Sequence, residues 1–364
     1  MLVTREKGYR FFMQRHLACL PALLAILWSG TAAADPITTL KGVLSTYNVF
    51  VMGDMGSPAN PYSSDSQGPV AVGGNAYLQD FTVAGTSNNG VNALTVGGKL
   101  NQLRATDGGN VFVGGNADFH NGSQGGATVN GTLTVNGTLI HPPTSYVGPR
   151  QTGPSPINFA SLQSELTAAS SQLASSTYGT QGTVTYQNQY NQKELDLFGT
   201  DPSLNVFNVS GALLGQIGGV NPNYSDGGGS FHINIPDGAT AIINVDGVDV
   251  NFGHPGNFGF FCGAQTCTEQ NGSKILFNFF QATTLDIQSV TGSLLAPLAD
   301  ITFTNGQLLG MMVAGSLGGP LYRTGEFHNV AFTGALPTPI PAPAAISLLI
   351  AGLGFLTLRK RNAV

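Results

Sequence analysis

The sequence predicts an all-β domain, built as a β-solenoid with one flanking α-helix. Three observations lead to this prediction: short repeats with glycine corners, a composition rich in glycine, and a single segment with helical periodicity. Glycine accounts for 50 of the 364 residues, whereas charged residues make up only 9%. Hydrophobic residues make up 41%, which is too much for a disordered chain. A polar but weakly charged chain of this kind is typical of extracellular β structure with many turns.

The first 34 residues have the three parts of a secretory signal peptide. Four basic residues precede an apolar run from Leu17 to Trp28, and small residues follow this run. Ala32 and Ala34 form an A-x-A site, so cleavage is expected after Ala34. The alternative is an N-terminal transmembrane helix, for which the apolar run is short. The sequence therefore predicts export, with Cys19 removed together with the signal peptide.

Residues 70–139 contain an imperfect repeat. Its copies read VAVGGN, LTVGGK, VFVGGN and LTVNGT, and they begin at Val70, Leu94, Val111 and Leu133. Each copy has apolar residues at alternate positions before a Gly-Gly or Asn-Gly corner. Glycine permits positive φ at such a corner and lets stacked coils approach closely. Repeats of about twenty residues predict rungs of a β-solenoid, with a β-sandwich made of hairpins as the alternative.

A helix is expected at about residues 158–175. It follows a proline-rich linker, and Asn158 is a suitable N-cap. Five apolar residues of this segment fall on one helical face: Phe159, Leu162, Leu166, Ala169 and Leu173. This apolar stripe is expected to pack along the flank of the strands.

Strand-like segments resume at Val184 and continue to Leu317. Two cysteines lie among them, Cys262 and Cys267. An oxidising compartment favours a disulfide between these cysteines. A metal site would need further ligands, and only His254 is close in sequence.

The charge distribution bears on partners. Of the 14 basic and 19 acidic residues, four basic and one acidic lie in 1–34, and three basic lie in 337–364. This leaves 7 basic and 18 acidic residues between 35 and 336, a formal net charge of −11. An acidic surface disfavours nucleic acid and anionic lipid as partners.

No pattern in the sequence indicates catalysis, so we expect a protein that is not an enzyme and that needs no cofactor. Paired carboxylates are the strongest contrary signal, because two carboxylates roughly 5–10 Å apart can cleave a glycoside. The candidates are Asp246, Asp249, Asp286 and Asp300. Oxygen-rich turns at 246–249 and 221–230 suit calcium, although neither matches a defined calcium loop. T-x-T pairs beginning at residues 132, 183 and 302 raise ice binding, but they are not at rung spacing.

Residues 337–364 combine three features of an export tail. Pro341, Pro343, Ala344 and Ala345 form a Pro-x-Pro-Ala-Ala motif, an apolar segment spans 343–358, and Arg359, Lys360 and Arg361 follow. A helix over 343–358 would be about 24 Å long, which is short for a bilayer core of about 30 Å. The tail resembles the PEP-CTERM sorting signal of Gram-negative bacteria, which an exosortase handles, although Ala342 stands where the usual glutamate is found. A plain tail anchor is the alternative.

Two blocks of the body carry a second resemblance. YNVFVMGD with GPVAVGGNAYL near the start, and GSLLAPLADITFTNGQLLGMMVAGSL with GEFHNVAFTG near the end, resemble the choice-of-anchor A domain over roughly residues 40–334. The second block is also similar to the final coils of right-handed β-helical, ice-binding-like adhesion domains with a helix along their flank. These resemblances imply a right-handed solenoid and a surface role, and they imply no catalytic residues.

Together these observations predict an exported cell-surface or extracellular-matrix protein with a structural or adhesive role. The alternatives are a glycan- or ice-binding module and a polysaccharide-cleaving enzyme. The expected partners are an exosortase-type sorting enzyme, exopolysaccharide and neighbouring surface proteins. The C-terminal segment is expected to place the chain transiently in the inner membrane before it reaches the cell envelope or the matrix.

Overall fold

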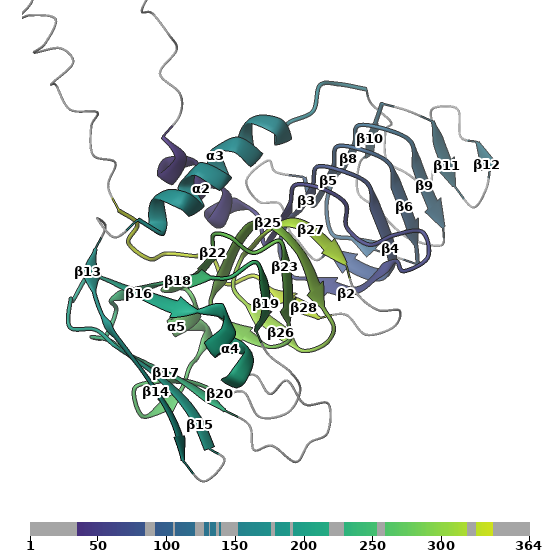
Figure 1. Ribbon diagram of the computed structural model, residues 1–364. Coiled ribbons are helices and arrows are strands. Elements are labelled where there is room, and N and C mark those ends of the chain that lie inside the picture. Colours follow the sequence, from purple (N-terminus) through teal and green to yellow (C-terminus); the bar gives the residue numbers. More distant parts are fainter. Residues whose placement is uncertain are drawn as a thin grey trace, which may run out of the picture. The chain divides into compact units, whose positions relative to one another are not determined.

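The structure, a computed structural model, describes residues 35–83, 92–104, 106–120, 127–130, 132–135, 138–139, 152–175, 179–189, 192–217, 229–252, 259–318 and 325–337. The chain divides into two compact units, Met1–Asp35 and Pro36–Val364, and the described elements belong to the second. This unit is mostly β with few helices, and most of its strands pair in parallel (Figure 1). The all-β class that the sequence predicts is therefore confirmed.

The first large sheet has 13 strands. Its order is β10 (Ala127–Val129), β8 (Val111–Val113), β5 (Leu94–Val96), β3 (Val70–Val72), β1 (Val49–Val51), β27 (Met312–Gly318), β25 (Ser293–Phe303), β22 (Ile275–Phe279), β18 (Thr240–Asp246), β16 (Leu204–Ser210) and β13 (Thr180–Gln181). β19 (Asp249–Phe252) and β23 (Thr284–Ile287) extend this sheet beside β25.

The second large sheet has 10 strands. Its order is β12 (Thr138–Leu139), β11 (Leu133–Val135), β9 (Ala117–His120), β6 (Leu100–Leu103), β4 (Ala76–Val83), β2 (Tyr62–Ser66), β28 (Glu326–His328), β26 (Gln307–Leu309) and β24 (Val290–Thr291), with β7 (Thr106–Asp107) beside β4.

A third sheet, which we call the side sheet, has five strands. They are β14 (Thr183–Gln189), β15 (Gln192–Phe198), β17 (Ser230–Asn234), β20 (Gly259–Cys262) and β21 (Gln265–Thr266). Two short helices complete this part of the chain, α4 (Gly211–Ile217) and α5 (Glu269–Gly272).

Consecutive strands of the repeat region alternate between the two large sheets. β3, β5, β8 and β10 stack in parallel in the first sheet, and β4, β6, β9 and β11 stack in parallel in the second. Each repeat thus contributes one strand to each sheet. The hairpins of a β-sandwich would have been paired antiparallel instead.

The fourth repeat does not begin at Leu133 as the sequence predicts. Ala127 pairs with Val111, whereas Leu133 pairs with Ala117 and so belongs to the second sheet. The amide of Asn130 donates to the carbonyl of Val113 at 3.0 Å, as the Gly114 amide donates to Val96 at 2.8 Å. The corner of the fourth copy is therefore at Asn130: two Asn-Gly pairs lie close together here, at 130–131 and 136–137, and the earlier one forms the corner.

Close approach between rungs explains the glycine corners. A Cβ atom on Gly73 would lie 2.2 Å from the carbonyl oxygen of Met52, and one on Gly97 would lie 2.4 Å from that of Gly73. Gly114 has the same relation to Gly97, at 2.3 Å. The expectation of positive φ at these corners is wrong, since none of the three adopts it. The stacking distance alone excludes a side chain here.

Gly97→Ala is therefore expected to destabilise the protein by about 1–3 kcal/mol, because the new methyl group meets backbone rather than a movable side chain. Denaturant unfolding measures this change. Gly42→Ala is the matched control: it lies within a helix with nothing inside 4 Å of the new Cβ, and should stabilise by about 0.5–1 kcal/mol. Equal unfolding midpoints for Gly97→Ala and the unmodified protein would contradict this account.

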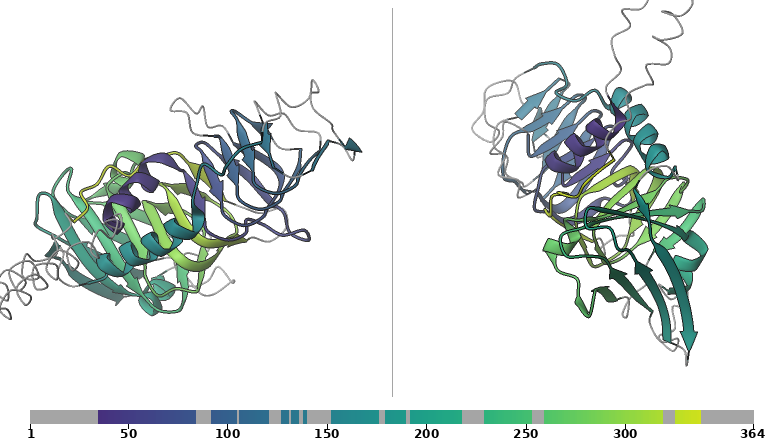
Figure 2. Two further views of the ribbon diagram at one scale, coloured as in Figure 1. Left: turned by 90° about the horizontal axis from the view of Figure 1, so that it is seen from above. Right: turned by 90° about the vertical axis from the view of Figure 1, so that its left-hand side faces the viewer.

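Two helices cover the outer face of the first sheet: α2 (Pro36–Thr46) and α3 (Phe159–Leu173) (Figure 2). Their apolar side chains form a cluster with outward residues of the strands, among them Phe50, Ala71 and Leu276. The side chains on the other face of these strands, such as Val49 and Val51, belong to the main core. Short strands such as VFV and VAV are buried throughout because both of their faces are covered.

The expected helix corresponds to α3, and its N-cap Asn158 accepts a hydrogen bond from the amide of Ser161. Leu166, Ala169 and Leu173 are buried on its inner face. The expectation of a single flanking helix is wrong, since α2 packs beside α3. α2 has 11 residues and begins at Pro36, two residues after Ala34. The small residues at this point of the sequence predict a cleavage site.

An asparagine ladder joins α3 to the sheet. Asn244 and Asn278 occupy paired positions of β18 and β22, and both are buried. The side-chain Nδ2 of Asn278 donates to the backbone carbonyl of Ser170 at 2.8 Å, and the side-chain Nδ2 of Asn244 donates to that of Leu173 at 2.9 Å. Asn278 also donates to the side chain of Asn244 at 2.9 Å, so the two asparagines are hydrogen-bonded to each other as well as to the helix. The last turn of α3 is thereby held in one position on the sheet.

Candidate functional site

A row of short polar side chains runs across the outward face of β19, β23, β25 and β27. Asp249 pairs with Thr284, Thr284 with Asp300, and Asp300 with Ser316. The Thr284 hydroxyl donates to Asp249 at 2.5 Å, and the Ser316 hydroxyl donates to Asp300 at 2.7 Å. Their neighbours along each strand, such as Leu285 and Ile301, point into the core. Strand alternation thus places the polar atoms on one flat surface.

The same row continues into the repeat region. Met55 forms bridges to Leu317 on one side and to Ala76 on the other, which brings Asp54 into line with Ser316 and Asn75. The amide N–H of Asn75 donates to the Asp54 carboxylate at 2.6 Å. Lys99 N–H donates to the Asn75 side chain at 2.9 Å, and Thr132 N–H donates to Asn116 at 3.0 Å. Each acceptor side chain therefore binds the backbone of the next rung.

A second row lies two residues further along each strand. Its pairs include Asn251 with Asp286, Asp286 with Thr302, and Asn101 with Asp118. We call these two rows together the polar face. Lateral spacing between neighbouring strands is about 4.8 Å, so the polar face presents side chains at a regular interval.

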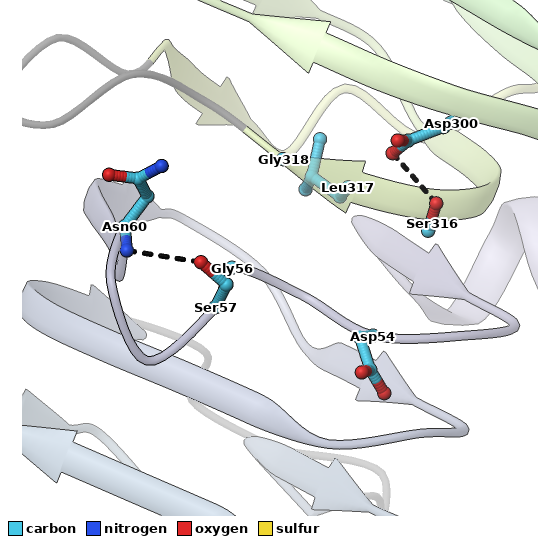
Figure 3. A pocket seen from close by; sticks show the side chains of 8 residues that line it. All are labelled: Asp54, Gly56, Ser57, Asn60, Asp300, Ser316, Leu317 and Gly318. Atoms are coloured by element: carbon cyan, nitrogen blue, oxygen red, sulfur yellow. Dashed lines mark hydrogen bonds between the residues drawn. The ribbon is translucent and has the colours of Figure 1, made fainter.

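A pocket of about 250 Å³ opens within the polar face, where the segment 54–60 meets β25 and β27 (Figure 3). Asp54 and Asp300 approach it from different strands, and Ser316 donates to Asp300 inside it. Its remaining lining residues are Gly56, Ser57, Asn60, Leu317 and Gly318. The lining offers hydrogen-bond donors and acceptors beside apolar surface, a combination that suits a hydroxylated ligand.

Three of the carboxylates that the sequence marked as candidate catalytic residues share the polar face: Asp286 lies diagonally from both Asp249 and Asp300, about 7–8 Å away, because its partners Asn251 and Thr302 are two residues further along their strands. Asp249 and Asp300 are separated by the strand that carries Thr284, hence by about 10 Å, and each accepts a hydroxyl hydrogen bond. Asp246 accepts a hydrogen bond from the amide of Gly211 at 3.0 Å, which fixes the start of α4. Asp286 is exposed in the second row of the polar face.

The sequence did not lead us to predict a site at the residues that directly follow the glycine corners. Asp54, Asn75, Lys99 and Asn116 each follow the last glycine of a corner, and this shared position was visible in the repeat. Thr284 and Ser316 carry no such mark, because they are recognised only from strand register. The predicted T-x-T pairs do not gather: Thr183 and Thr185 lie in the side sheet, and Thr302 lies in β25.

Cys262 and Cys267 form a disulfide whose Cα atoms lie 4.9 Å apart. It closes the short connection between β20 and β21 at the edge of the side sheet. Among the described residues, no three His, Cys, Asp or Glu side chains are arranged to hold a metal ion.

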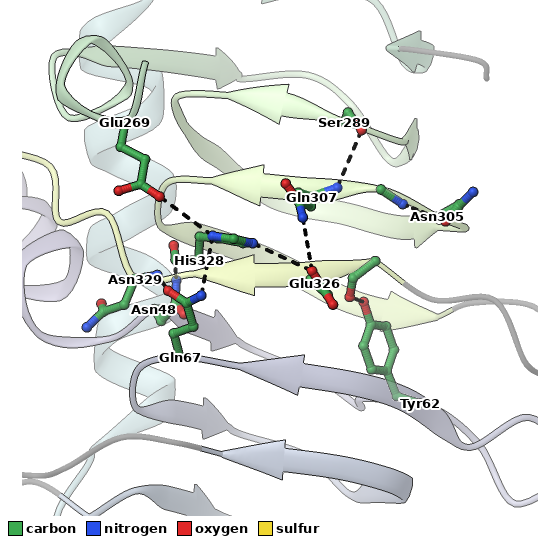
Figure 4. A network of polar contacts seen from close by, with 12 residues as sticks. Asn48, Tyr62, Gln67, Glu269, Ser289, Asn305, Gln307, Glu326, His328 and Asn329 are labelled. Atoms are coloured by element: carbon green, nitrogen blue, oxygen red, sulfur yellow. Dashed lines mark hydrogen bonds and ion pairs between the residues drawn. The ribbon is translucent and has the colours of Figure 1, made fainter. Parts of the chain in front are cut away.

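A second polar cluster surrounds His328 on β28 (Figure 4). Its Nδ1 lies 3.7 Å from Glu269 and its Nε2 lies 3.6 Å from Glu326, while Gln67 is within 3.3 Å. Burial, reinforced by the Glu326 carboxylate, raises the pKa of Asp65 on the neighbouring strand, and His328 opposes this shift. The cluster joins α5 to the second sheet.

The predicted processing sites lie outside the described residues. These are Ala32 and Ala34 at the N-terminus, and Pro341, Pro343, Ala344, Ala345, Arg359, Lys360 and Arg361 at the C-terminus, together with the apolar segment 343–358. Within the part of the chain that the structure describes, no helix is long and apolar enough to cross a membrane.

Comparison with known proteins gives one family. Residues 40–329 match the family model described as "Putative Ice-binding-like adhesive domain". Neither a curated protein nor a solved structure matches the chain. The matched residues contain both halves of the polar face, from Asp54 to Ser316. The chain therefore belongs to the family of ice-binding-like adhesive domains.

Proposed function

We propose that this protein is an exported surface or extracellular-matrix protein that adheres through its polar face. The observation that carries the proposal is the continuous polar row from Asp249 through Ser316 and Asp54 to Asn116, within a domain of an adhesive family. Regularly spaced hydroxyl, amide and carboxylate groups suit many weak contacts with polysaccharide or with neighbouring surface proteins. Many weak contacts on one rigid surface bind strongly in combination.

The alternation of consecutive strands between two parallel sheets supports a right-handed β-solenoid as the finer description of the fold. A solenoid repeats one surface position at every rung, so a side chain chosen once recurs across the whole face. The hydrogen bonds that the backbone N–H groups of Lys99 and Thr132 donate to the side chains of Asn75 and Asn116 favour this interpretation.

The termini support a route to the surface. A signal peptide ending at Ala34 and a PEP-CTERM-like tail over 337–364 would export the chain, hold it briefly in the inner membrane and present it to an exosortase-type enzyme. The body would then be a choice-of-anchor A domain. Intact-mass analysis of secreted material should show that Arg359, Lys360 and Arg361 are lost. Mature protein that retains them would contradict sorting by cleavage and indicate a permanent anchor.

Thr284→Arg tests the role of the polar face, because it places a long charged side chain at an exposed position in the middle of the first row. Retention of protein-coated beads on immobilised exopolysaccharide should fall at least tenfold, since the raised side chain prevents flat contact along the row. Ser45→Arg is the matched control, because Ser45 is exposed on α2, away from the polar face. Unchanged retention with Thr284→Arg would remove the polar face from the adhesive surface.

We further propose binding without turnover, and without a required cofactor. If the purified protein hydrolysed a common polysaccharide at enzymatic rates, the carboxylates of the polar face would become catalytic candidates instead. A thermal-hysteresis assay separates the ice-binding alternative, for which Thr284→Arg should abolish activity. A glycan array separates recognition of one sugar from general adhesion.

A further inference from the structure

The outward face of the side sheet has a different chemistry from the polar face. Alternation along its strands sends Leu195, Leu197, Phe231 and Ile233 into the core. The opposite positions form three rows across the sheet. The rows are Thr185–Asp196–His232–Phe261, Gln187–Glu194–Ser230 and Thr183–Phe198–Asn234.

Aromatic rings lie on this face, and that of Phe198 is exposed. The Phe198 side chain is 57% exposed, a large fraction for a phenylalanine in the middle of a structured region. The rings of His232 and Phe261, on neighbouring strands, stack against each other with centroids 4.7 Å apart and planes 13° apart, and both residues are half-buried. Exposed flat rings are suited to ligands that present a flat apolar surface or a cation.

Carboxylates lie beside the aromatic rings of this face. Glu194 and Asp196 occupy adjacent outward positions of β15, and Oε1 of Glu194 lies 3.1 Å from Nε2 of His232. Lys193 has the parity of Leu195 and Leu197, which places it on the opposite face of the strand. Among the described outward positions of the side sheet, no lysine or arginine is present. The face is therefore both aromatic and negatively charged.

We propose that this face of the side sheet binds a polysaccharide that carries free amino groups. A sugar ring stacks through its C–H surface on the exposed ring of Phe198, and its ammonium group pairs with Asp196 or Glu194. The net charge of −11 between residues 35 and 336 complements a cationic polymer and repels an anionic one. Thr185, Gln187 and Asn234 supply hydrogen bonds to the hydroxyls.

The proposal specifies a ligand class for an adhesive protein, and so it rests on the proposed function in its general form. It does not depend on the polar face, which lies on different strands. The probes are a glucosamine hexamer, whose amino groups are free and can carry charge, and its N-acetylated counterpart, in which they are neutral amides. Binding to the purified full-length protein is measured by titration calorimetry at low and at physiological salt.

We expect the glucosamine hexamer to bind at least tenfold more tightly than the N-acetylated hexamer, with affinity falling as salt rises. Glu194→Gln combined with Asp196→Asn should weaken its binding about tenfold, and Phe198→Ala about fivefold. Asp237→Asn, in the exposed turn after β17, removes a carboxylate elsewhere and should leave binding unchanged. Thermal melting of each variant checks that the fold is retained.

Equal affinity for the two hexamers would overturn the proposal, as would unchanged binding in both the carboxylate variant and Phe198→Ala. If Thr284→Arg fails to reduce adhesion while the hexamer results hold, the polar-face proposal fails and the side-sheet proposal stands. If adhesion falls in Thr284→Arg and the hexamers bind equally, the reverse conclusion applies.

Discussion

Phe277→Ala is expected to lower the free energy of unfolding by about 3–5 kcal/mol. Phe277 is fully buried in β22 and lies at the centre of an aromatic cluster. Its ring centroid is 4.8 Å from that of Phe252, 5.7 Å from that of Phe231 and 6.0 Å from that of Phe260. Phe231 and Phe260 come from the side sheet, so the cluster joins the side sheet to the first large sheet.

The expected loss has two parts. Removing the ring forfeits its burial and leaves a cavity that rigid strands on both sides cannot close. Edge-to-face contacts with Phe231 and Phe260 contribute about 0.5–1.5 kcal/mol each to this total. Urea unfolding monitored by far-ultraviolet circular dichroism measures the change.

Phe198→Ala is the matched control for this prediction, because it deletes the same side chain from an exposed position of the side sheet. Its unfolding free energy should stay within about 1 kcal/mol of that of the unmodified protein. If Phe277→Ala were as mild as Phe198→Ala, the aromatic cluster would not be what joins the two sheets.

The second large effect is expected for Asn48→Ala, at about 2–4 kcal/mol. Asn48 is fully buried just before β1, and its amide group makes four good hydrogen bonds. Its Nδ2 donates to the carbonyls of Gly310 at 3.0 Å and His328 at 3.1 Å (Figure 4). Its Oδ1 accepts from the Ser66 hydroxyl at 3.0 Å and from the Gly68 amide at 3.1 Å.

Alanine would leave these partners without hydrogen bonds in a place that water does not reach, which is the costly case for buried polar groups. Asn48→Asp separates shape from chemistry, because it keeps the volume but turns an oxygen toward two carbonyl oxygens. It should destabilise at least as strongly as alanine at neutral pH. Asn305→Ala, at an exposed position, should shift the unfolding midpoint only slightly. A mild effect of both Asn48 variants would show that the four contacts are not held together in solution.

Short-range chemistry accounts for several elements that were predicted without the structure. Asn158 and the apolar spacing from Phe159 to Leu173 define α3, since capping and periodicity act within a few residues. The glycine pairs mark corners because a side chain there would meet backbone, and this requirement is visible as a repeat. The position after each corner was equally local, and it could have identified Asp54 and Asn75.

Other features depend on contacts between distant parts of the chain. Val49 pairs with Met312, so β1, the first strand of the domain, joins its last long strand, β27. Neither strand indicates this partner, because a parallel pair shows no turn and each short apolar run fits several neighbours equally well. The single row through Ser316 and Asp54 follows from that pairing, and so does its pocket.

Amino-acid order along the chain was thus sufficient for the all-β class, the corners and the main helix. Tertiary packing decided which strands are neighbours, that α2 joins α3 on the first sheet, and that scattered Asp, Thr, Ser and Asn residues share one surface. The physical reason is the sequence separation of the residues that interact: caps, corners and periodicity involve residues a few positions apart. Register, by contrast, is set by burying both faces of strands that lie up to 263 residues apart, as Val49 and Met312 do.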